Sequence, residues 1–272
     1  MNDIPSIPSP TGTTRLYAIL GDPIAQVKGP TLMNRLFTQL GVDAVMVPVH
    51  VRPEALQAVL AALRRIENMD GMLVTIPHKF AVCDGVERLS PAVQLAGSAN
   101  ALRRTPDGSW EADNFDGRGF VAGLRAQGRD PAGRVIGVAG SGGAGVAIAA
   151  ALVEAGAAAI RVRDVRPEQA ERLVRRLNAH RAGVAQVEPE GTDWRGADVV
   201  VNATPLGLQP TDPLPFDPLA LPVDTLVADI IMQPRETRLL QLAERRGMPV
   251  FHGEHMLAHQ IEMYRRFFLG ED

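Results

Sequence analysis

Residues 134–145 read Arg-Val-Ile-Gly-Val-Ala-Gly-Ser-Gly-Gly-Ala-Gly, a short apolar run that passes directly into a glycine-rich turn. The residues that follow, 146–154, are rich in alanine and favour a helix. A strand, a glycine turn and a helix in this order are typical of the site where a dinucleotide pyrophosphate binds, because the helix dipole and its unpaired N–H groups attract the anion. The stretch therefore predicts a dinucleotide-binding fold.

Each glycine of this turn has an expected role. Gly140 permits the tight turn, Gly142 lets the backbone approach the phosphates, and Gly145 lets the helix lie close to its strand. Asp164 comes 19 residues after Gly145 and is expected to accept hydrogen bonds from a ribose 2′-OH. No Gly-Lys-Ser/Thr sequence follows the glycines, which argues against a P-loop. The expected cofactor contacts in this segment are Gly140, Ser141, Gly142, Gly143, Ala144 and Gly145.

The composition is that of an ordinary globular protein. The chain has 272 residues, 46% hydrophobic and 22% charged, which is enough for two domains. A net charge of −3 gives no basic surface, so nucleic acid is not an expected partner. Without a signal-peptide pattern or a long apolar run, we expect a cytoplasmic protein that does not enter a membrane. The proline-rich residues 1–14 are expected to be disordered, and the single cysteine, Cys83, to be a buried thiol.

Two series of alternating strands and helices follow along the chain. The first has expected strands at 16–20, 44–49 and 71–76, helices at 31–40 and 53–66, and a hairpin at 100–113. The second has expected strands at 134–139, 159–163, 184–187, 197–201 and 226–229, a proline-rich loop at 204–222 and a last helix at 254–268. The predicted fold class is α/β, with an N-terminal α/β domain, a Rossmann-type doubly wound dinucleotide-binding domain and a C-terminal helix that returns to the first domain.

Several short motifs, together with the glycine turn, carry a resemblance to a known family. They are Gly21-Asp22-Pro23-Ile24, Val74-Thr75-Ile76-Pro77-His78-Lys79, Gly97-Ser98-Ala99-Asn100, Asp113-Asn114-Phe115-Asp116-Gly117, Val201-Asn202-Ala203-Thr204-Pro205, and Met256-Leu257 followed by Gln260. From about residue 15 onward the chain resembles the shikimate dehydrogenase family. Motifs that share the family's order are far more specific together than any one of them alone.

The resemblance implies a reversible, NAD(P)-dependent oxidation of a ring hydroxyl on a shikimate-like or quinate-like cyclic hydroxy acid or related polyol. It implies that Lys79 and Asp116 are the proton-transfer pair. The implied substrate ligands are Thr75, Asn100 and Gln260. The implied cofactor ligands beyond the glycine turn are Asn202, Ala203, Thr204, Pro205 and Gly253. The implied domains are a substrate-binding catalytic domain at 1–116 and 254–272, and an NAD(P)-binding domain at 117–253.

At five positions the chain departs from the family pattern. Val27 and Gly29 replace a Ser-x-Ser pair that binds the substrate carboxylate, Leu73 replaces an asparagine, Phe115 a threonine and Met232 a tyrosine. Each exchange removes a hydrogen-bonding group, at a cost of about 1–3 kcal/mol per lost bond. We therefore expect these residues to line a substrate pocket of changed specificity that uses shikimate poorly. Either the substrate is more apolar, or Lys28 or Gln26 anchors its carboxylate; loss of the activity is the remaining interpretation.

The residues after the second strand of the Rossmann domain bear on the choice of cofactor. In the family that this chain resembles, members that use NADP carry Asn-Arg-Thr at this place, whereas this chain has Asp164-Val165-Arg166. The arginine that pairs with the 2′-phosphate is replaced by Val165, and the Asp164 carboxylate is expected to repel that phosphate. We therefore predict NAD as the cofactor and NADP as the less favoured one, although Arg163 and Arg166 flank the site.

Two other functions fit parts of the sequence. A non-catalytic nucleotide-binding metabolite sensor derived from this family needs the glycine turn but neither Lys79 nor Asp116. A folate-type dehydrogenase shares the two-domain layout but not the Asn-Phe-Asp and Met-Leu-x-x-Gln segments. His255 and His259 lie four residues apart, but the residues between them are not those of a metallohydrolase motif, so no metal is expected. The expected partner is a small molecule, and the chain is expected to be a monomer or homodimer.

Overall fold

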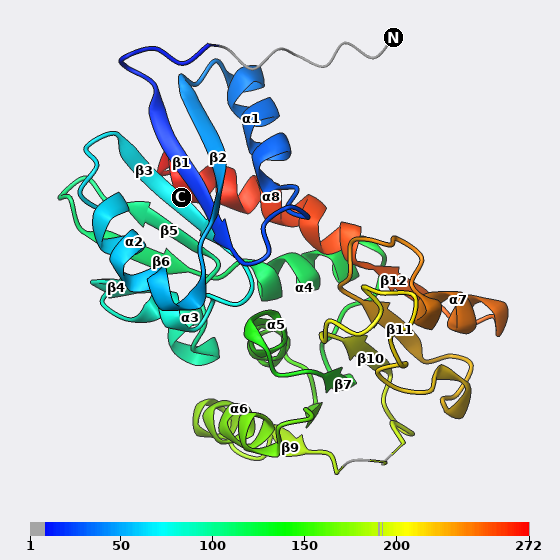
Figure 1. Cartoon of the computed structure of the whole chain (residues 1–272). Coiled ribbons are helices and arrows are strands. Elements are labelled where there is room, and N and C mark those ends of the chain that lie inside the picture. Colours follow the sequence, from blue (N-terminus) through cyan, green and yellow to red (C-terminus); the bar gives the residue numbers. More distant parts are fainter. Residues whose placement is uncertain (1–8, 190, 192, 272) are drawn as a thin grey trace, which may run out of the picture. The chain divides into compact units, whose positions relative to one another are not determined.

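The computed structural model describes residues 9–189, 191 and 193–271. Within them the chain divides into two compact units, each with its own six-stranded sheet (Figure 1). Unit 1 comprises Met1–Val93, Gly97–Asn114 and Ile261–Asp272, and unit 2 comprises Gln94–Ala96 and Phe115–Gln260. The functional domains expected at 1–116 with 254–272, and at 117–253, stay predictions.

Unit 1 contains a mixed sheet in the strand order β2-β1-β3-β5-β6-β4. Its strands are β1 (Arg15–Gly21), β2 (Ala44–His50), β3 (Met69–Val74), β4 (Arg88–Leu89), β5 (Ala101–Arg104) and β6 (Trp110–Asp113). β1 runs parallel to β2 and β3, whereas β5 is antiparallel to β3 and β6. Its helical segments are α1 (Gly29–Leu40), a 3-10 turn at Pro53–Ala55, α2 (Leu56–Leu63), a second 3-10 turn at Ala81–Cys83, the first half of α3 (Pro91–Ala96) and the last part of α8 (Gly253–Leu269).

Successive residues of β1 face opposite sides of the unit 1 sheet, as the pleat of a strand requires. On one side, Leu20 joins an apolar cluster that includes α2. On the other side, the Tyr17 ring lies 5.0 Å from the ring of Phe37 in α1 and 4.9 Å from that of Phe268 in α8, between centroids. Gly71 in β3 leaves room for α8, because a Cβ there would lie 2.6 Å from the Phe268 ring. The last turns of α8 thus complete the core of unit 1.

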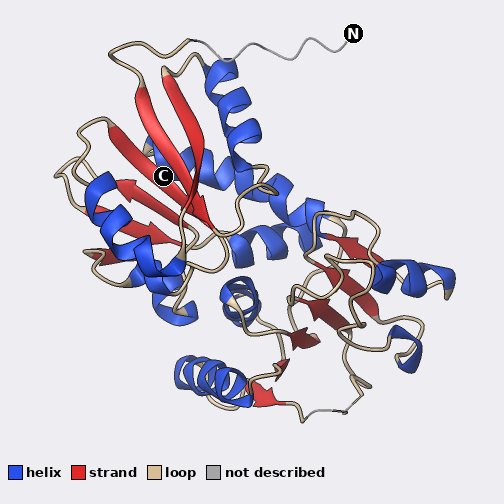
Figure 2. Ribbon diagram, viewed as in Figure 1, coloured by secondary structure: helices blue, strands red, loops and turns tan. Residues whose placement is uncertain are grey.

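Unit 2 contains an all-parallel sheet in the order β12-β11-β10-β7-β8-β9, which is the doubly wound arrangement. Its strands are β7 (Val135–Ala139), β8 (Ala159–Arg163), β9 (Ala185–Val187), β10 (Val199–Asn202), β11 (Leu226–Asp229) and β12 (Val250–His252). Its helical segments are α4 (Asp116–Ala126), α5 (Gly143–Glu154), α6 (Pro167–His180), a 3-10 turn at Pro218–Ala220, α7 (Arg238–Arg245) and the first part of α8. Figure 2 distinguishes these helices from the strands they accompany.

Both faces of the unit 2 sheet are buried. Val199 and Val201 of β10 belong to a cluster built with α4, α5 and α6, whereas Val200 belongs to a second cluster with α7 and Trp194. Strands buried on both faces have continuous apolar sequences. The carboxyl ends of the parallel strands share one edge of the sheet, and the strand order reverses between β7 and β10. Folds of this class bind ligands at such a reversal point.

The predicted α/β fold class is confirmed, and every strand expected from the sequence is present within a few residues of its expected limits. The helix expected at 53–66 is shorter, because it begins as a 3-10 turn and α2 ends at Leu63. The helices α3, α4, α6 and α7 and the strands β4 and β12 were not predicted from the sequence. β12 has three residues, too few for an alternating pattern to be recognised.

The lead-in expected to be disordered at 1–14 falls in part outside the described residues, since residues 1–8 are not described. At its end the prediction is wrong. The hydroxyls of Thr13 and Thr14 donate to the Asp43 carboxylate at 2.8 and 2.7 Å, and Thr14 is buried. Separately, none of the described helices is both long enough and apolar enough to cross a membrane.

Candidate active site

Within unit 1, the fold brings Thr75, Lys79 and Asn100 to one end of the sheet. Thr75 directly follows β3, and Asn100 directly precedes β5, the strand beside β3. The Val74 N–H donates to the Asn100 carbonyl at 2.8 Å, and the Ala99 N–H donates to the Lys79 carbonyl at 2.8 Å. Asn100 is buried and Lys79 half-buried. The loop that carries Lys79 is thus held against the segment that carries Asn100.

The loop after β3 is anchored to β1 and to the segment after β2. The Thr75 N–H donates to the Leu20 carbonyl at 2.9 Å. The His78 ring is buried, and its Nε2 lies 2.7 Å from the Val51 carbonyl oxygen. A Cβ at Gly21 would lie 2.4 Å from Thr75 Cγ2, so this position accepts only glycine. The glycine that opens the first motif therefore makes room for a predicted substrate ligand.

Three of the five departures from the family pattern, Val27, Gly29 and Leu73, belong to unit 1. Gly29 is the first residue of α1, and a Cβ there would lie 3.2 Å from Ile19 Cδ1 and 3.4 Å from Leu73 Cδ1. Ile19 and Leu73 are buried, so the Cβ of a serine at position 29 would meet two apolar side chains. The φ angle of Gly29 is not positive, and a side chain there meets no backbone strain. Val27 is half-buried.

In unit 2, Asp116 and Gln260 form a buried hydrogen bond although 144 residues separate them. Gln260 Nε2 donates to Asp116 Oδ1 at 2.9 Å, and each residue is 3% exposed. The pair forms because α4 approaches its neighbours closely. A Cβ at Gly119 would lie 2.6 Å from Gln260 Cγ, and one at Gly117 would lie 2.0 Å from the Ala147 carbonyl oxygen of α5. Burial and this bond hold the Asp116 carboxylate in one orientation.

The other two departures, Phe115 and Met232, belong to unit 2. Phe115 is the N-cap residue of α4 and is buried, and the Arg118 guanidinium lies 4.4 Å from the centroid of its ring. That geometry is a cation–π contact. Met232 is half-buried and packs against the apolar cluster around α5. The contact of either side chain with a substrate stays a prediction.

The glycine turn has the geometry that its sequence predicts. Gly140 has a φ of +100°, which favours glycine. A Cβ at Gly145 would lie 2.0 Å from the Gly140 carbonyl oxygen, so α5 packs directly on the turn. Gly142 caps α5, and nothing lies within 4 Å of the position its Cβ would take. The turn therefore leaves space at the N-terminus of a helix, where backbone N–H groups and the helix dipole favour an anion.

The other residues expected to contact the cofactor lie at the carboxyl edge of the same sheet. Asp164, Val165 and Arg166 follow β8, Asn202 ends β10 and is followed by Ala203, Thr204 and Pro205, and Gly253 follows β12. The Ala203 N–H donates to the Ala139 carbonyl at 2.8 Å, which joins the loop after β10 to the end of β7. Unit 2 thus gathers these residues along one edge of its sheet, as the motifs predict.

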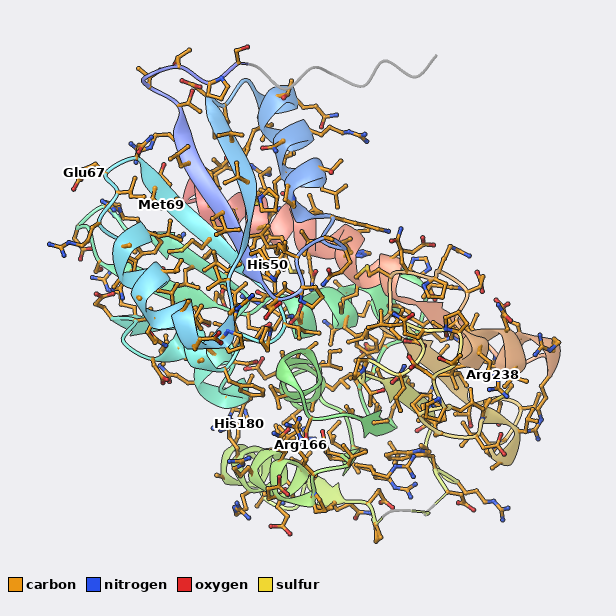
Figure 3. All side chains as sticks on the ribbon, in the orientation of Figure 1. His50, Glu67, Met69, Arg166, His180 and Arg238 are labelled. Carbon is orange, nitrogen blue, oxygen red and sulfur yellow. The ribbon has the colours of Figure 1, made fainter. Side chains whose placement is uncertain are left out.

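The Asp164 carboxylate is largely used by neighbouring protein groups. The N–H and hydroxyl of Ser141 donate to its Oδ2 at 2.6 and 2.7 Å, and the Arg166 N–H donates to its Oδ1 at 2.9 Å. Only 6% of the Asp164 side chain is exposed. Val165 is 90% exposed, and the side chain of Arg166, labelled in Figure 3, is 58% exposed. The Asp164 carboxylate therefore holds the glycine turn in place. The Arg166 side chain is more exposed than the Asp164 side chain.

A buried network beneath the loop after β10 was missed by the sequence analysis. Asn202 Nδ2 donates to Asp229 Oδ1 at 3.1 Å and to the Leu206 carbonyl at 3.0 Å, while its Oδ1 accepts from the Thr204 hydroxyl at 2.6 Å. The Thr237 hydroxyl donates to Asp229 Oδ2 at 2.8 Å. Burial raises the pKa of Asp229 to about 6. The signal in the sequence was an aspartate at the end of an apolar strand. Asn202 thus holds the loop, rather than presenting a free amide to a cofactor.

Among the described residues, Glu236, Glu244 and His252 bring three metal-ligating atoms within 4.8 Å of one another. His252 Nε2 lies 3.0 Å from a Glu236 carboxylate oxygen, so the group is an ion-pair cluster if the histidine is protonated. His255 and His259, singled out in the sequence, do not belong to it. His259 Nδ1 lies 2.8 Å from the His255 carbonyl oxygen, a contact within one helix.

A family model described as the shikimate dehydrogenase substrate binding domain matches residues 19–102. A shikimate dehydrogenase (NADP(+)) of Rubrobacter xylanophilus is 38% identical over 270 residues, covering 98% of this chain and 95% of that protein. The shikimate 5-dehydrogenase of Listeria monocytogenes, solved with shikimate and NAD, is 26% identical with a TM-score of 0.85, covering 97% of this chain and 94% of that one. The 5-ketofructose reductase of Gluconobacter sp. strain CHM43 is 28% identical with a TM-score of 0.82, covering 94% and 93%.

Fold and motifs together define a two-unit α/β oxidoreductase with a Rossmann-like cofactor domain. The chain belongs to the shikimate dehydrogenase family. The predicted preference for NAD over NADP is wrong, because the relative from R. xylanophilus and others are named as NADP(+) enzymes. The prediction failed because it treated Asp164 as a charge that faces the ribose. Its carboxylate instead accepts hydrogen bonds from the glycine turn, while the Arg166 side chain is 58% exposed and its Nε lies 3.8 Å from Asp164 Oδ1.

The buried carboxyl of Asp229 predicts a pH-dependent stability. Well below pH 4 it is protonated in the folded and the unfolded chain. As the pH rises through about 6, the folded protein has to ionise a buried carboxyl, whereas the unfolded chain has already ionised. The wild type should therefore lose folding free energy relative to Asp229→Asn, by at most about 3 kcal/mol between pH 4 and 7. Denaturant unfolding of both proteins across this range measures the difference.

Asp212→Asn is the matched control, with the opposite sign. The N–H groups of Gln209 and Gly207 lower the pKa of Asp212, so its contribution is present at neutral pH and is lost as the pH falls. A stability difference between wild type and Asp229→Asn that stays constant from pH 4 to 7 would show that the carboxyl does not titrate in this range.

Proposed function

We propose that this protein catalyses the NADP(H)-dependent, reversible oxidation of a ring hydroxyl on a cyclic polyol or hydroxy acid of the shikimate and quinate type. Lys79 and Asp116 are the proposed proton-transfer pair, and Thr75, Asn100 and Gln260 the proposed ligands of substrate hydroxyls. The observation that carries the proposal is the backbone hydrogen bond of 2.8 Å between the residue before Asn100 and Lys79. It supports a shared role for the two side chains in unit 1.

The proposed reaction assigns a separate task to each polar group. The hydroxyl oxygen gives its proton to the Lys79 and Asp116 pair while the carbon that bears this hydroxyl gives up a hydride, and the cofactor supplies the hydride acceptor when it is bound. The hydrogen bond from Gln260 and the burial of Asp116 keep the carboxylate in place for this transfer. In the direction of reduction, the same pair returns the proton to the carbonyl oxygen.

The proposed cofactor site lies along the carboxyl edge of the unit 2 sheet. The space at Gly142 and the N-terminus of α5 suit a pyrophosphate. The exposed side chain of Val165 offers an apolar surface to the adenine, and Arg166 offers a cation to the 2′-phosphate. Arg163 is less suited to that contact, because its guanidinium already lies 4.7 Å from the centroid of the Trp194 ring. We therefore assign the 2′-phosphate to Arg166.

The proposed substrate is a hydroxylated ring. Two serines do not hold a carboxylate on this ring, because Val27 and Gly29 stand at those positions. The apolar side chains of Ile19 and Leu73 beside Gly29 support this, because an ionised group loses its water there without replacement. A 5-ketofructose reductase among the similar structures is named for a ketose, a substrate without a carboxylate. Of the alternative anchors, Gln26 donates to a backbone carbonyl of its own loop at 2.8 Å, whereas Lys28 is exposed.

The cofactor assignment is tested by Arg166→Ala. The variant should lower kcat/KM for NADP+ about tenfold, or roughly 1.4 kcal/mol, and leave the value for NAD+ within about twofold, because only NADP+ carries the 2′-phosphate. Arg172→Ala, which removes an exposed arginine of α6, is the control. Initial rates with both cofactors give the comparison. An equal loss with both would contradict the assignment, and a wild type that prefers NAD+ would contradict the proposed cofactor.

The proton-transfer pair is tested by Lys79→Met and Asp116→Asn, which keep the approximate size of each side chain. Each should lower kcat about 100-fold or more while the Kd for NADPH changes by less than about threefold, because the cofactor site is left intact. Turnover and NADPH fluorescence titration are compared. Retention of most turnover by Lys79→Met would place the proton transfer elsewhere. A wild type that binds NADPH but oxidises no cyclic alcohol would favour a metabolite sensor.

The substrate pocket is tested by restoring the family's polar side chains. The wild type should use shikimate with a high KM. Val27→Ser, Gly29→Ser and Leu73→Asn combined should raise kcat/KM for shikimate about tenfold, since charge-assisted hydrogen bonds contribute roughly 1.5–3 kcal/mol each, less the mismatch that remains. Gly29→Ala with Val27→Ala fills the same space without hydroxyls and should give no gain. Efficient shikimate oxidation by the wild type would contradict the proposal, and Lys28→Ala would then identify the anchor.

A further inference from the structure

Asn100 is held by more than its backbone. Its side-chain Nδ2 donates to the hydroxyl of Tyr264 at 2.9 Å, and both residues belong to unit 1. Asn100 is 2% exposed and Tyr264 6% exposed, so the bond forms away from bulk water. The Asn100 N–H also donates to the Asp113 carbonyl at 3.0 Å, and its carbonyl accepts from Val74 at 2.8 Å. Backbone and side chain of Asn100 are therefore both tied to neighbouring elements.

Tyr264 is itself held by aromatic packing. It lies one helical turn after Gln260 in α8, and its ring is stacked 6.4 Å from that of Phe268. Phe268 in turn lies 4.9 Å from Tyr17, a residue of β1. The phenol hydroxyl is thus carried on a ring whose position is set by the core of unit 1, so it can impose a direction on the side chain it contacts.

We propose that Tyr264 is a positioning residue that sets the orientation of the Asn100 amide toward the substrate. The inference rests on the proposed function, in which Asn100 binds a substrate hydroxyl. The nitrogen and oxygen of a planar amide point in different directions, so a bond that fixes Nδ2 also fixes Oδ1 as the acceptor on the other side of the group. The phenol hydroxyl thus opposes a half-turn rotation of the amide, which would present a donor in place of the acceptor.

The sequence has only two tyrosines, Tyr17 and Tyr264, and Tyr17 serves as the matched control for Tyr264. Tyr264→Phe removes the hydroxyl that contacts Asn100 and keeps the ring. Tyr17→Phe removes the hydroxyl of a ring that is also buried and also packs on Phe268. The two variants therefore share any loss that comes only from changing a buried tyrosine in this core.

The experiment is a double-mutant cycle with Tyr264→Phe, Asn100→Ala and both together, in the full chain. Oxidation of shikimate and quinate with NADP+ and reduction of 5-ketofructose with NADPH are measured in parallel. Tyr264→Phe should lower kcat/KM roughly three- to tenfold for the substrate that the wild type uses best, mainly through KM, and should leave the KM for the cofactor unchanged. In the Asn100→Ala background the same change should have no effect, and Tyr17→Phe should alter kcat/KM by less than about twofold.

An equal effect of Tyr264→Phe in both backgrounds, or an effect no larger than that of Tyr17→Phe, would overturn the inference. If Asn100→Ala lowers kcat/KM for the substrate and Tyr264→Phe does not, the inference is overturned while the proposed function still holds. If Asn100→Ala changes no rate, or the wild type turns over none of the three substrates, the proposed function fails. The inference can also be tested without turnover, by following hydrogen exchange of the Asn100 side-chain amide by NMR. Tyr264→Phe should lower the protection of this amide from exchange, and Tyr17→Phe should leave it unchanged. Unchanged protection in Tyr264→Phe would overturn the inference.

Discussion

Helix α4 lies so close to its neighbours that two of its first four residues have to be glycine. A single added carbon at Gly117 would lie 2.0 Å from a backbone oxygen of α5, and one at Gly119 would lie 2.6 Å from Gln260. Backbone against backbone cannot relax as two flexible side chains can. The close approach fixes where α4 begins and therefore where Asp116 lies. The orientation of the carboxylate and its bond to Gln260 both depend on this contact.

The features that could be predicted from the sequence are those with a short-range cause. The glycine turn is one, because its backbone angles and its contact with α5 involve residues only a few positions apart. The parallel strands of unit 2 are another, because burial on both faces gives each an apolar run. Two separate motifs point out Asp116 and Gln260, but neither motif predicts the hydrogen bond between them. Its partners meet through the packing of α4 on α8, which no local pattern contains.

Polar side chains next to a binding motif were the ones whose roles were hardest to predict from the sequence. Asp164 has the spacing of a ribose ligand, yet its oxygens accept hydrogen bonds from Ser141 and from the turn that follows. Asn202 lies in a motif associated with the cofactor, yet its amide joins Asp229 to the loop after β10. A sequence gives the type and spacing of such groups but not whether the protein itself already uses them. In both cases the hydrogen-bond partners are within the fold.

The packing of Phe268 against Gly71 has a consequence for how the chain is made. The ring covers one face of the unit 1 sheet, but it comes from the end of α8, after all of unit 2 has been synthesised. During translation, β1 and β3 are therefore complete long before the side chain that covers them leaves the ribosome. Unit 2 is continuous from Phe115 to Gln260 apart from a short piece of α3 and can fold as it emerges. Until Phe268 arrives, the sheet face that it shares with Phe37 of α1 is only partly covered, and this is the period in which the nascent chain most needs protection from aggregation.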